Sequence, residues 1–380
     1  SAWVTRTDAG RDFALARVQG LLPGSAELRW KSVEGQLYQG LQFERLTYTD
    51  GELRIEAATL GFKVSLSPLL YRKLYLKQIN ATHVRIDLPK DDTPFELPRW
   101  PESLPTLDLP LAIQAQRIEI SDIRLLREHK PVYALETLKG GLRMSSGALQ
   151  LNDINAESTD GTLHLNGSYL PGKGYKTRLT GSVKIKTADS GSPSLLLKAE
   201  GDAKQFLLDL EGSMPEPLRL RWQLRTENKK PFWLFTGSTE RFEPRYLGLL
   251  DSHAYRMQLA ASGDSSHAQL VGEISRDAET VVIEPSRFAL DSDRIRIEAL
   301  ALAYRGARLT ASGNVRSGEV FSSDGLDIAV SDFTLPNGGT EGAVPVMLDT
   351  AVHWAGRIDR WAMNAQGTLR RGDTTAQFTM

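Results

Sequence analysis

The sequence predicts an all-β protein: an elongated, twisted antiparallel sheet curled into an open apolar groove (a β-taco, or repeating β-groove), with a short N-terminal helix. Apolar and polar residues alternate in runs such as Leu53-Arg54-Ile55-Glu56-Ala57, and this period of two gives a sheet one apolar face. The runs are short and end at glycine or at turn signals such as Asp50-Gly51. No helical stretches of about 10–15 residues separate them, which excludes a doubly wound parallel sheet.

Composition excludes several classes of function. The chain has 380 residues, 46 basic and 47 acidic side chains, and no cysteine. Disulfides, thiolate metal sites and a cysteine nucleophile are therefore excluded. Without a sustained basic block, we expect no nucleic-acid partner. No run approaches the roughly 18 apolar residues of a membrane span, and we expect that a signal or membrane anchor precedes the abrupt start at Ser1.

The first predicted element is a helix within residues 5–20, which we assign as an N-terminal region of residues 1–20. Asp8 is a candidate N-cap, and the apolar residues between Phe13 and Val18 form a stripe. Gly20 and the Pro23-Gly24 pair end the helix.

From residue 26 onward the alternation predicts about two dozen strands of roughly five or six residues each. Their ranges are 26–30, 41–47, 53–59, 62–66, 74–79, 84–88, 112–120, 123–127, 142–144, 149–151, 162–165, 180–185, 195–199, 206–210, 218–224, 232–235, 255–261, 268–274, 280–283, 294–302, 308–315, 326–330, 346–354, 361–367 and 376–380. A proline-rich excursion, 89–110, interrupts them and cannot belong to a central strand. Residues 239–250 are expected to form a short helix or a loop.

Three all-β architectures fit such a pattern. A chain of β-sandwich domains would cover one apolar face with another, but no linker separates units of about 100 residues. Short strands without aromatic girdles count against an outer-membrane barrel. The third is one continuous groove region, 21–380, whose open apolar face needs an apolar occupant.

The first ninety residues also resemble a known family. Leu22-Pro23-Gly24, the turn pair 34–41 (EGQLYQGL), and the block 67–79 followed by 84–89 (VRIDLP) resemble the opening of the TamB family within the AsmA-like superfamily. Residues 3–10 resemble the segment that follows this family's inner-membrane anchor. The motifs concern turns and patterning rather than catalysis. Family members are much longer, so the resemblance implies an amino-terminal periplasmic fragment.

The resemblance implies a bridge-like lipid-transfer protein of the Gram-negative periplasm, carrying phospholipid between the inner and outer membranes. Its implied partners are phospholipids, the inner membrane through an N-terminal anchor, and outer-membrane TamA through a C-terminal region. The alternative is a scaffold or chaperone that assembles outer-membrane proteins or autotransporters with TamA, for example by strand addition. A plain adhesin-like β-sandwich remains a third possibility.

No motif points to an enzyme, and we expect no catalytic residues, no cofactor and no metal site. The histidines show no metal-ligand spacing; they are His83, His129, His164, His253, His267 and His353. His164 stands between two leucines, so we expect it to face away from the apolar side. Gly172-Lys173-Gly174 lacks the spacing of a phosphate-binding loop.

In the groove interpretation, acyl chains lie against inward-facing apolar side chains and lose contact with water at about 0.8 kcal/mol per methylene. The expected lining residues are Leu53, Ile55, Phe62, Val64, Leu66, Leu74, Leu76, Val84, Ile86, Ile118, Ile120, Leu142, Leu149, Leu163, Val183, Leu208, Leu220, Trp222, Leu259, Ile283, Ile297, Leu309, Ile328 and Val352.

Overall fold

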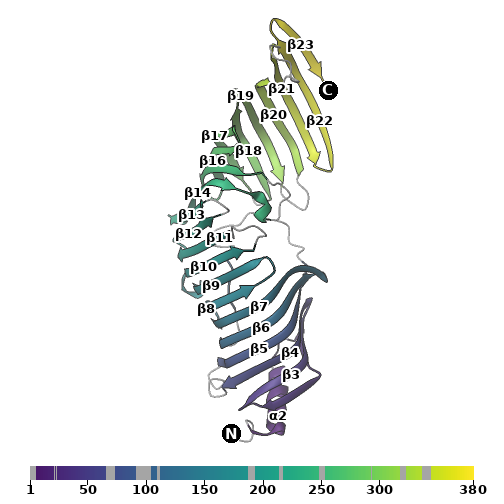
Figure 1. The fold of residues 1–380 in the computed structure, drawn as a ribbon, viewed down its shortest axis with the longest axis vertical. Coiled ribbons are helices and arrows are strands. Elements are labelled where there is room, and N and C mark those ends of the chain that lie inside the picture. Colours follow the sequence, from purple (N-terminus) through teal and green to yellow (C-terminus); the bar gives the residue numbers. More distant parts are fainter. Residues whose placement is uncertain are drawn as a thin grey trace. The chain divides into compact units, whose positions relative to one another are not determined.

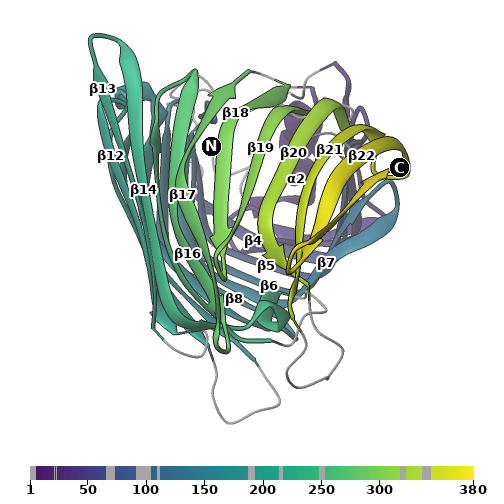
Figure 2. The ribbon, with the colours of Figure 1, turned by 90° about the horizontal axis from the view of Figure 1, so that it is seen from above.

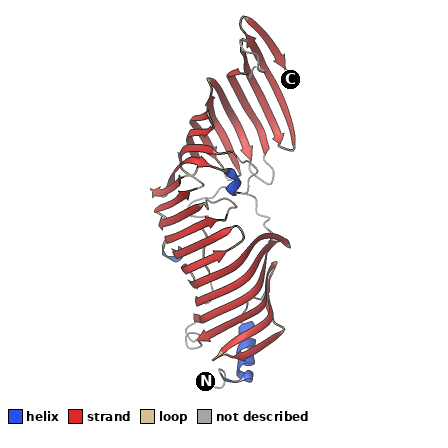
Figure 3. Cartoon of the chain, viewed as in Figure 1, coloured by secondary structure: helices blue, strands red, loops and turns tan. Residues whose placement is uncertain are grey.

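The computed structural model is almost entirely β-sheet, as expected (Figures 1 and 3). It describes residues 6–20, 22, 24–65, 73–90, 104–108, 112–186, 193–213, 217–247, 253–291, 293–316, 322–335 and 344–380. Its 23 strands belong to one open sheet, and the strands are curled (Figure 2). By contacts the described strands form two compact units, β1–β11 in unit 1 and β12–β23 in unit 2, and each unit is described by itself.

Unit 1 begins with the helix α2 (Asp8–Gln19). Its N-cap is Thr7, whose Oγ1 accepts a hydrogen bond from the Gly10 N–H at 3.1 Å. The expected cap at Asp8 is therefore wrong by one position, and Asp8 is the acidic residue of the first turn. This arrangement satisfies one of the free N–H groups at the helix start.

Eleven strands follow the helix in unit 1. They are β1 (Ala26–Arg29), β2 (Ser32–Gln36), β3 (Gly40–Asp50), β4 (Leu53–Ser65), β5 (Lys73–Leu88), β6 (Ala112–Arg127), β7 (Lys130–Ser145), β8 (Ala148–Glu157), β9 (Gly161–Leu170), β10 (Lys176–Ile185) and β11 (Ser194–Gly201). β1 and β2 both pair with β3, and from β3 onward each strand pairs with the next. The sequence had not predicted β2, because SVEGQ contains no alternating apolar run.

The expectation of a purely antiparallel sheet is wrong at one place, since β5 and β6 are parallel. Parallel neighbours need a long crossover connection, and the chain between Leu88 and Ala112 provides it. Most of the proline-rich excursion lies outside the described residues. Its described part follows the edge of unit 1, where the Leu107 carbonyl accepts from Gly147 N–H at 2.8 Å and the Pro105 carbonyl from Tyr169 OH at 2.6 Å.

Unit 2 contains twelve strands, joined in sequence order by antiparallel pairing. They are β12 (Gln205–Ser213), β13 (Pro217–Glu227), β14 (Lys230–Phe242), β15 (Tyr255–Gly263), β16 (His267–Arg276), β17 (Glu279–Leu290), β18 (Arg294–Tyr304), β19 (Ala307–Arg316), β20 (Ser322–Thr334), β21 (Val346–Arg357), β22 (Arg360–Arg371) and β23 (Thr374–Thr379). The segment 239–250 was expected to be a short helix or a loop. Its first residues complete β14, and the expected short helix is the 3-10 helix Pro244–Leu247; the remainder lies outside the described residues.

Strands are longer than expected, reaching 16 residues in β5, β6 and β7. Three pairs of predicted strands are single strands: 53–59 with 62–66, 74–79 with 84–88, and 112–120 with 123–127. The alternation breaks inside β5 and β6 because His83 (φ 50°) and Asp122 (φ 54°) adopt the left-handed conformation, which Asn, Asp and His tolerate better than most residues. Arg45 (φ 50°) in β3 does the same.

This break does not move the apolar residues to the other side of the sheet. Ala81 and Val84 precede and follow His83, yet both are buried in one cluster with Ala57 and Ile123. The left-handed residues thus let two consecutive residues face outward while the apolar face continues.

Several glycines that suggested strand ends lie inside strands. Gly167 in β9 is an example: its φ is 133°, and an added Cβ would stand 2.0 Å from the Arg178 carbonyl oxygen of β10. Gly181 and Gly212 also lie within strands, whereas Gly201 is the last residue of β11, as its position suggested. Glycine is used here where neighbouring backbones approach closely, so it is a poor marker of strand boundaries in this chain.

Candidate functional site

The candidate site is the apolar face of the sheet, and strand register defines it. Paired residues of neighbouring strands point to the same face. In unit 1 one row crosses nine strands, β3 to β11, and every member is apolar: Phe43, Leu60, Ala81, Ile120, Leu138, Ala156, Leu163, Val183 and Leu195. A second row beside it is also free of polar side chains: Val64, Leu76, Ala115, Leu142, Leu151, Gly167, Leu179 and Ala199.

Unit 2 repeats this arrangement over a longer stretch. One row crosses eleven strands, β12 to β22, again without a polar side chain: Phe206, Leu224, Trp233, Gly263, Ala268, Phe288, Ile297, Gly313, Leu326, Trp354 and Met363. Another row contains Leu210, Leu220, Gly237, Leu259, Gly272, Ile283, Leu302, Leu309 and Val330 and reaches its first polar residue at Thr350.

The structure places the residues expected to line the groove on these two apolar faces. In unit 1 they are Leu53, Ile55, Phe62, Val64, Leu74, Leu76, Val84, Ile86, Ile118, Ile120, Leu142, Leu149, Leu163 and Val183. In unit 2 they are Leu208, Leu220, Trp222, Leu259, Ile283, Ile297, Leu309, Ile328 and Val352. Leu66 lies outside the described residues.

Sequence reasoning missed other members of the rows, notably Phe206, Trp233, Phe288 and Trp354. They lie in alternating runs, or directly beside them, and belong to the same residue types as the chosen Phe62 and Trp222. The inward glycines had no recognisable signal, because a glycine inside a strand and a glycine at a turn look alike in the sequence.

The apolar faces are largely uncovered. Among the described elements, strands make their extensive contacts only with hydrogen-bonded neighbours, and no second layer of strands packs on either face. A sandwich is therefore not formed within either unit. Leu163 is 39% exposed and Trp222 41% exposed, although both point to the apolar side. The accessible surface of the chain is 24333 Å², against about 15,000 Å² for a compact monomer of this mass.

One end of the unit 1 face is covered by the chain itself. Leu15 of α2 is buried together with Leu37, Leu41 and Phe43, so the helix lies on the first strands of the apolar face. Two side chains of the helix region also bind strand carbonyls: Arg11 NH1 donates to Gly35 O at 3.2 Å, and Gln19 Nε2 donates to Leu28 O at 3.0 Å.

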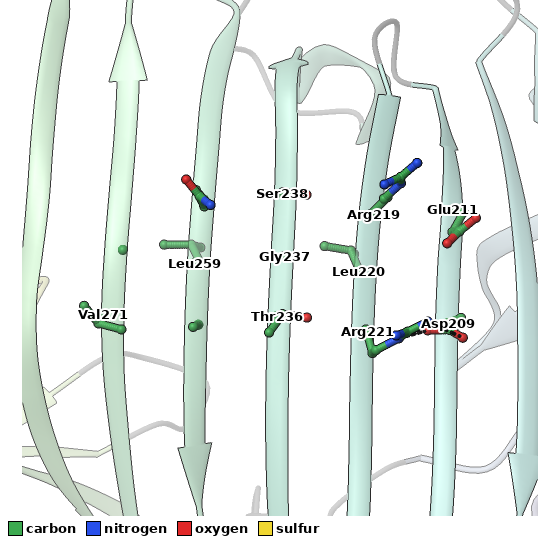
Figure 4. Close-up of a pocket in the computed structure, with 13 residues that line it drawn as sticks. Asp209, Glu211, Arg219, Leu220, Arg221, Thr236, Gly237, Ser238, Leu259 and Val271 are labelled. Atoms are coloured by element: carbon green, nitrogen blue, oxygen red, sulfur yellow. Dashed lines mark hydrogen bonds and ion pairs between the residues drawn. The ribbon is translucent and has the colours of Figure 1, made fainter.

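The opposite face is polar, and the hollows on it are shallow. One of about 500 Å³ lies over β12–β16 and is drawn in Figure 4. There Arg221 binds Asp209 through two hydrogen bonds, Nε–Oδ1 at 2.6 Å and NH2–Oδ2 at 3.2 Å. The hydrogen bond and the charge of Asp209 raise the pKa of Arg221. The charges of Arg221 and Asp209 neutralise each other. The pair therefore holds two adjacent strands together and does not resemble a site for proton transfer.

Histidines of this chain pair with acidic or amide side chains. His83 Nδ1 lies 2.5 Å from Asp122 Oδ2, and His164 Nδ1 lies 2.9 Å from Asn155 Oδ1. The hydrogen bond from His83 lowers the pKa of Asp122. His164 faces the polar side, as expected. No group of three or more His, Cys, Asp or Glu residues in the described part of the chain could hold a metal ion.

A buried carboxylate lies at the end of β5. Burial by itself raises the pKa of Asp87, but hydrogen bonds from the ring and the backbone N–H of His129 outweigh it, and the pKa is lowered. These bonds connect β5 to the turn after β6, so they stabilise the parallel pair at its end.

Comparisons with known proteins agree with the resemblance seen in the sequence. Residues 1–100 match the family model described as TamB, N-terminal domain. Comparison with curated proteins and with solved structures gives no match. Within the described residues, no helix has both the length and the apolar character needed to cross a membrane. The first hundred residues of the chain are thus similar to the N-terminal domain of TamB.

Proposed function

We propose that the apolar faces bind the acyl chains of phospholipids and carry them along the stacked strands between the two membranes of a Gram-negative envelope. The observation that carries the proposal is the pair of unbroken apolar rows, one over nine strands and one over eleven, without a covering layer. An uncovered apolar surface of this extent on a soluble domain is expected to serve as a binding surface. The residues expected from the sequence are the proposed lining.

Energetics favour a sliding ligand. Each methylene that leaves water for such a face gains about 0.8 kcal/mol. Neighbouring strands are about 4.8 Å apart and present similar side chains row after row, so adjacent positions have similar affinity. An acyl chain therefore meets small barriers as it passes from one strand to the next.

The TamB N-terminal domain supports an envelope role, and the remainder of the proposal follows from it. The protein works in the periplasm, tethered to the inner membrane by an N-terminal anchor. A C-terminal region meets the outer-membrane partner TamA. No cofactor is required by binding of this kind.

Native mass spectrometry of the protein purified without detergent, with lipid extraction in parallel, tests the proposal. We expect one or more phospholipids per chain. A lipid-free monomer that also fails to take up phospholipid from vesicles would refute it.

A second function is favoured by one observation: among the described strands, β23 is hydrogen-bonded only to β22. Such a free edge can accept a strand of another protein, as a scaffold for outer-membrane proteins would require. Hydrogen exchange distinguishes the two functions. Client binding at the edge would protect backbone amides of residues 374–379, whereas a lipid on the apolar face would leave them unchanged.

A further inference from the structure

Tryptophan is distributed unevenly over unit 2. Its four tryptophans in the described strands all belong to apolar-face positions: Trp222 in β13, Trp233 in β14, Trp354 in β21 and Trp361 in β22. Trp222 stands at the middle of its strand. The other three lie close to strand ends, and these ends are on the same side of the sheet.

We call this side the tryptophan edge; it contains the turns 228–229, 264–266 and 358–359. Trp233 is the fourth residue of β14, Trp354 lies three residues before the end of β21, and Trp361 is the second residue of β22. Trp361 is 55% exposed. An indole at this position has apolar neighbours on one side and solvated turns on the other.

Trp233 shows how an indole is held at this edge. Its Nε1–H donates to the carbonyl oxygen of Asp264, in the turn after β15, at 3.1 Å. Its Cζ2 would lie only 2.9 Å from a Cβ added to Gly263, the paired residue of β15. The ring therefore lies over the glycine, with its polar atom at the turn and its carbon atoms toward the apolar row.

The opposite edge of unit 2 differs. The turns there include 277–278, 305–306 and 372–373, and no tryptophan of the described strands lies beside them. Two tyrosines lie on the apolar side of this edge, Tyr255 at the start of β15 and Tyr304 at the end of β18. The Arg305 guanidinium lies 5.5 Å from the ring centre of Tyr304. The two edges of the same apolar face therefore offer different chemistry to a bound molecule.

We propose that the tryptophan edge is where the glycerol and headgroup region of a phospholipid lies while its acyl chains contact the apolar face of unit 2. This inference rests on the function proposed above and adds an orientation to it. Tryptophan is suited to this position because its ring is apolar over most of its area and carries one N–H donor, which is why it concentrates at the boundary between hydrocarbon and water. Headgroups at the opposite edge would meet no tryptophan of the described strands.

Because the chain has no cysteine, a single introduced thiol can report which edge a headgroup approaches. Ile358→Cys lies in the turn before β22, at the tryptophan edge, and Asp373→Cys lies in the turn after β22, at the opposite edge. Both positions are exposed, so the two variants are matched controls. Each would be loaded with phosphatidylethanolamine carrying a maleimide on its headgroup. The coupling rate would be divided by the rate with a small water-soluble maleimide.

We expect the Ile358→Cys variant to couple at least five times faster than the Asp373→Cys variant after this correction. Equal rates, or a faster Asp373→Cys variant, would overturn the orientation but leave lipid binding intact. A maleimide-bearing headgroup analogue that lacks acyl chains serves as the control reagent. If neither variant couples faster with the maleimide phospholipid than with this analogue, the function proposed above fails and the orientation fails with it.

Fluorescence quenching gives an independent measurement. Wild type, Trp222→Phe and Trp233→Phe proteins would be loaded with phosphatidylcholine carrying either a headgroup nitroxide or bromines deep in the acyl chain. We expect the Trp233→Phe change to remove more of the headgroup-nitroxide quenching, and the Trp222→Phe change to remove more of the bromine quenching. The reverse pattern would overturn the proposal.

Discussion

Replacing Leu163 by aspartate tests whether the apolar face is open. Leu163 is the seventh member of the nine-strand row of unit 1, between Ala156 and Val183, and is 39% exposed. Full burial of a leucine side chain contributes about 1.5–3 kcal/mol, so the fraction lost here is about 1–2 kcal/mol. The new carboxylate reaches water, and the additional cost of several kcal/mol for an unpaired buried charge is avoided.

Lipid binding should weaken by a comparable free energy. If two methylenes lose their apolar contact at this position, the loss is about 1.6 kcal/mol, or roughly 15-fold in occupancy. Urea unfolding followed by circular dichroism, and lipid content by mass spectrometry, measure the two effects separately.

Two control variants make the result interpretable. Leu196→Asp changes a leucine that is 62% exposed and faces the polar side, so it should alter neither stability nor lipid content. Leu41→Asp places a charge at a site that is 3% exposed under α2 and should destabilise the N-terminal strands strongly. If the Leu163 variant unfolds as readily as the Leu41 variant, the face around Leu163 is covered in solution and the open groove is refuted.

Three further predictions follow from local structure. Thr7→Ala removes the cap of α2 and should cost about 1 kcal/mol, seen as roughly five-fold faster hydrogen exchange of the helix amides; unchanged exchange would contradict the capping role. Gly167→Ala, whose Cβ would stand 2.0 Å from a carbonyl oxygen of β10 at a φ of 133°, should lower the free energy of unfolding by more than about 2 kcal/mol, whereas Gly24→Ala, with open space around it, should be neutral. The pKa of Asp122 is lowered in the folded state by His83, so its stabilising contribution is present above the ordinary aspartate pKa of about 3.9 and is lost as the pH falls through the lowered value. The difference in free energy of unfolding between wild type and Asp122→Asn should therefore shrink on acidification below about pH 4. A difference that grows on acidification would contradict this prediction.

The sequence predicted the fold class and the apolar side of most strands because both depend on a period of two, which the residues show directly. The prediction of strand length failed at His83 and Asp122, because a single left-handed residue shifts the period and looks like a turn. Gly167 was misread for a related reason: the close approach of two backbones depends on the neighbouring strand, which is not local in sequence. The parallel pairing of β5 with β6 was equally hidden, because alternation says nothing about strand direction.

The sequence predicted which residues of the candidate site share a face of the sheet, but not how these residues are aligned from strand to strand. Leu163 and Val183 were assigned correctly to one side, yet only strand register shows that they stand in one row with Ile120. Register depends on turn lengths and on irregularities inside strands, and neither could be predicted from this sequence. The edge position of Trp233 likewise depends on where β14 begins, which the sequence placed only approximately.

Each strand packs extensively only against its hydrogen-bonded neighbours, and this affects how the length of the sheet can change in evolution. A strand in either unit depends on the strand before and the strand after it, as a repeat depends on its neighbours in a solenoid. Insertion or loss of an antiparallel hairpin therefore changes the reach of such a sheet by about 10 Å without redesign of the remainder. Selection can therefore adjust the length of a sheet of this kind in steps of two strands, while the cross-section of the sheet stays the same.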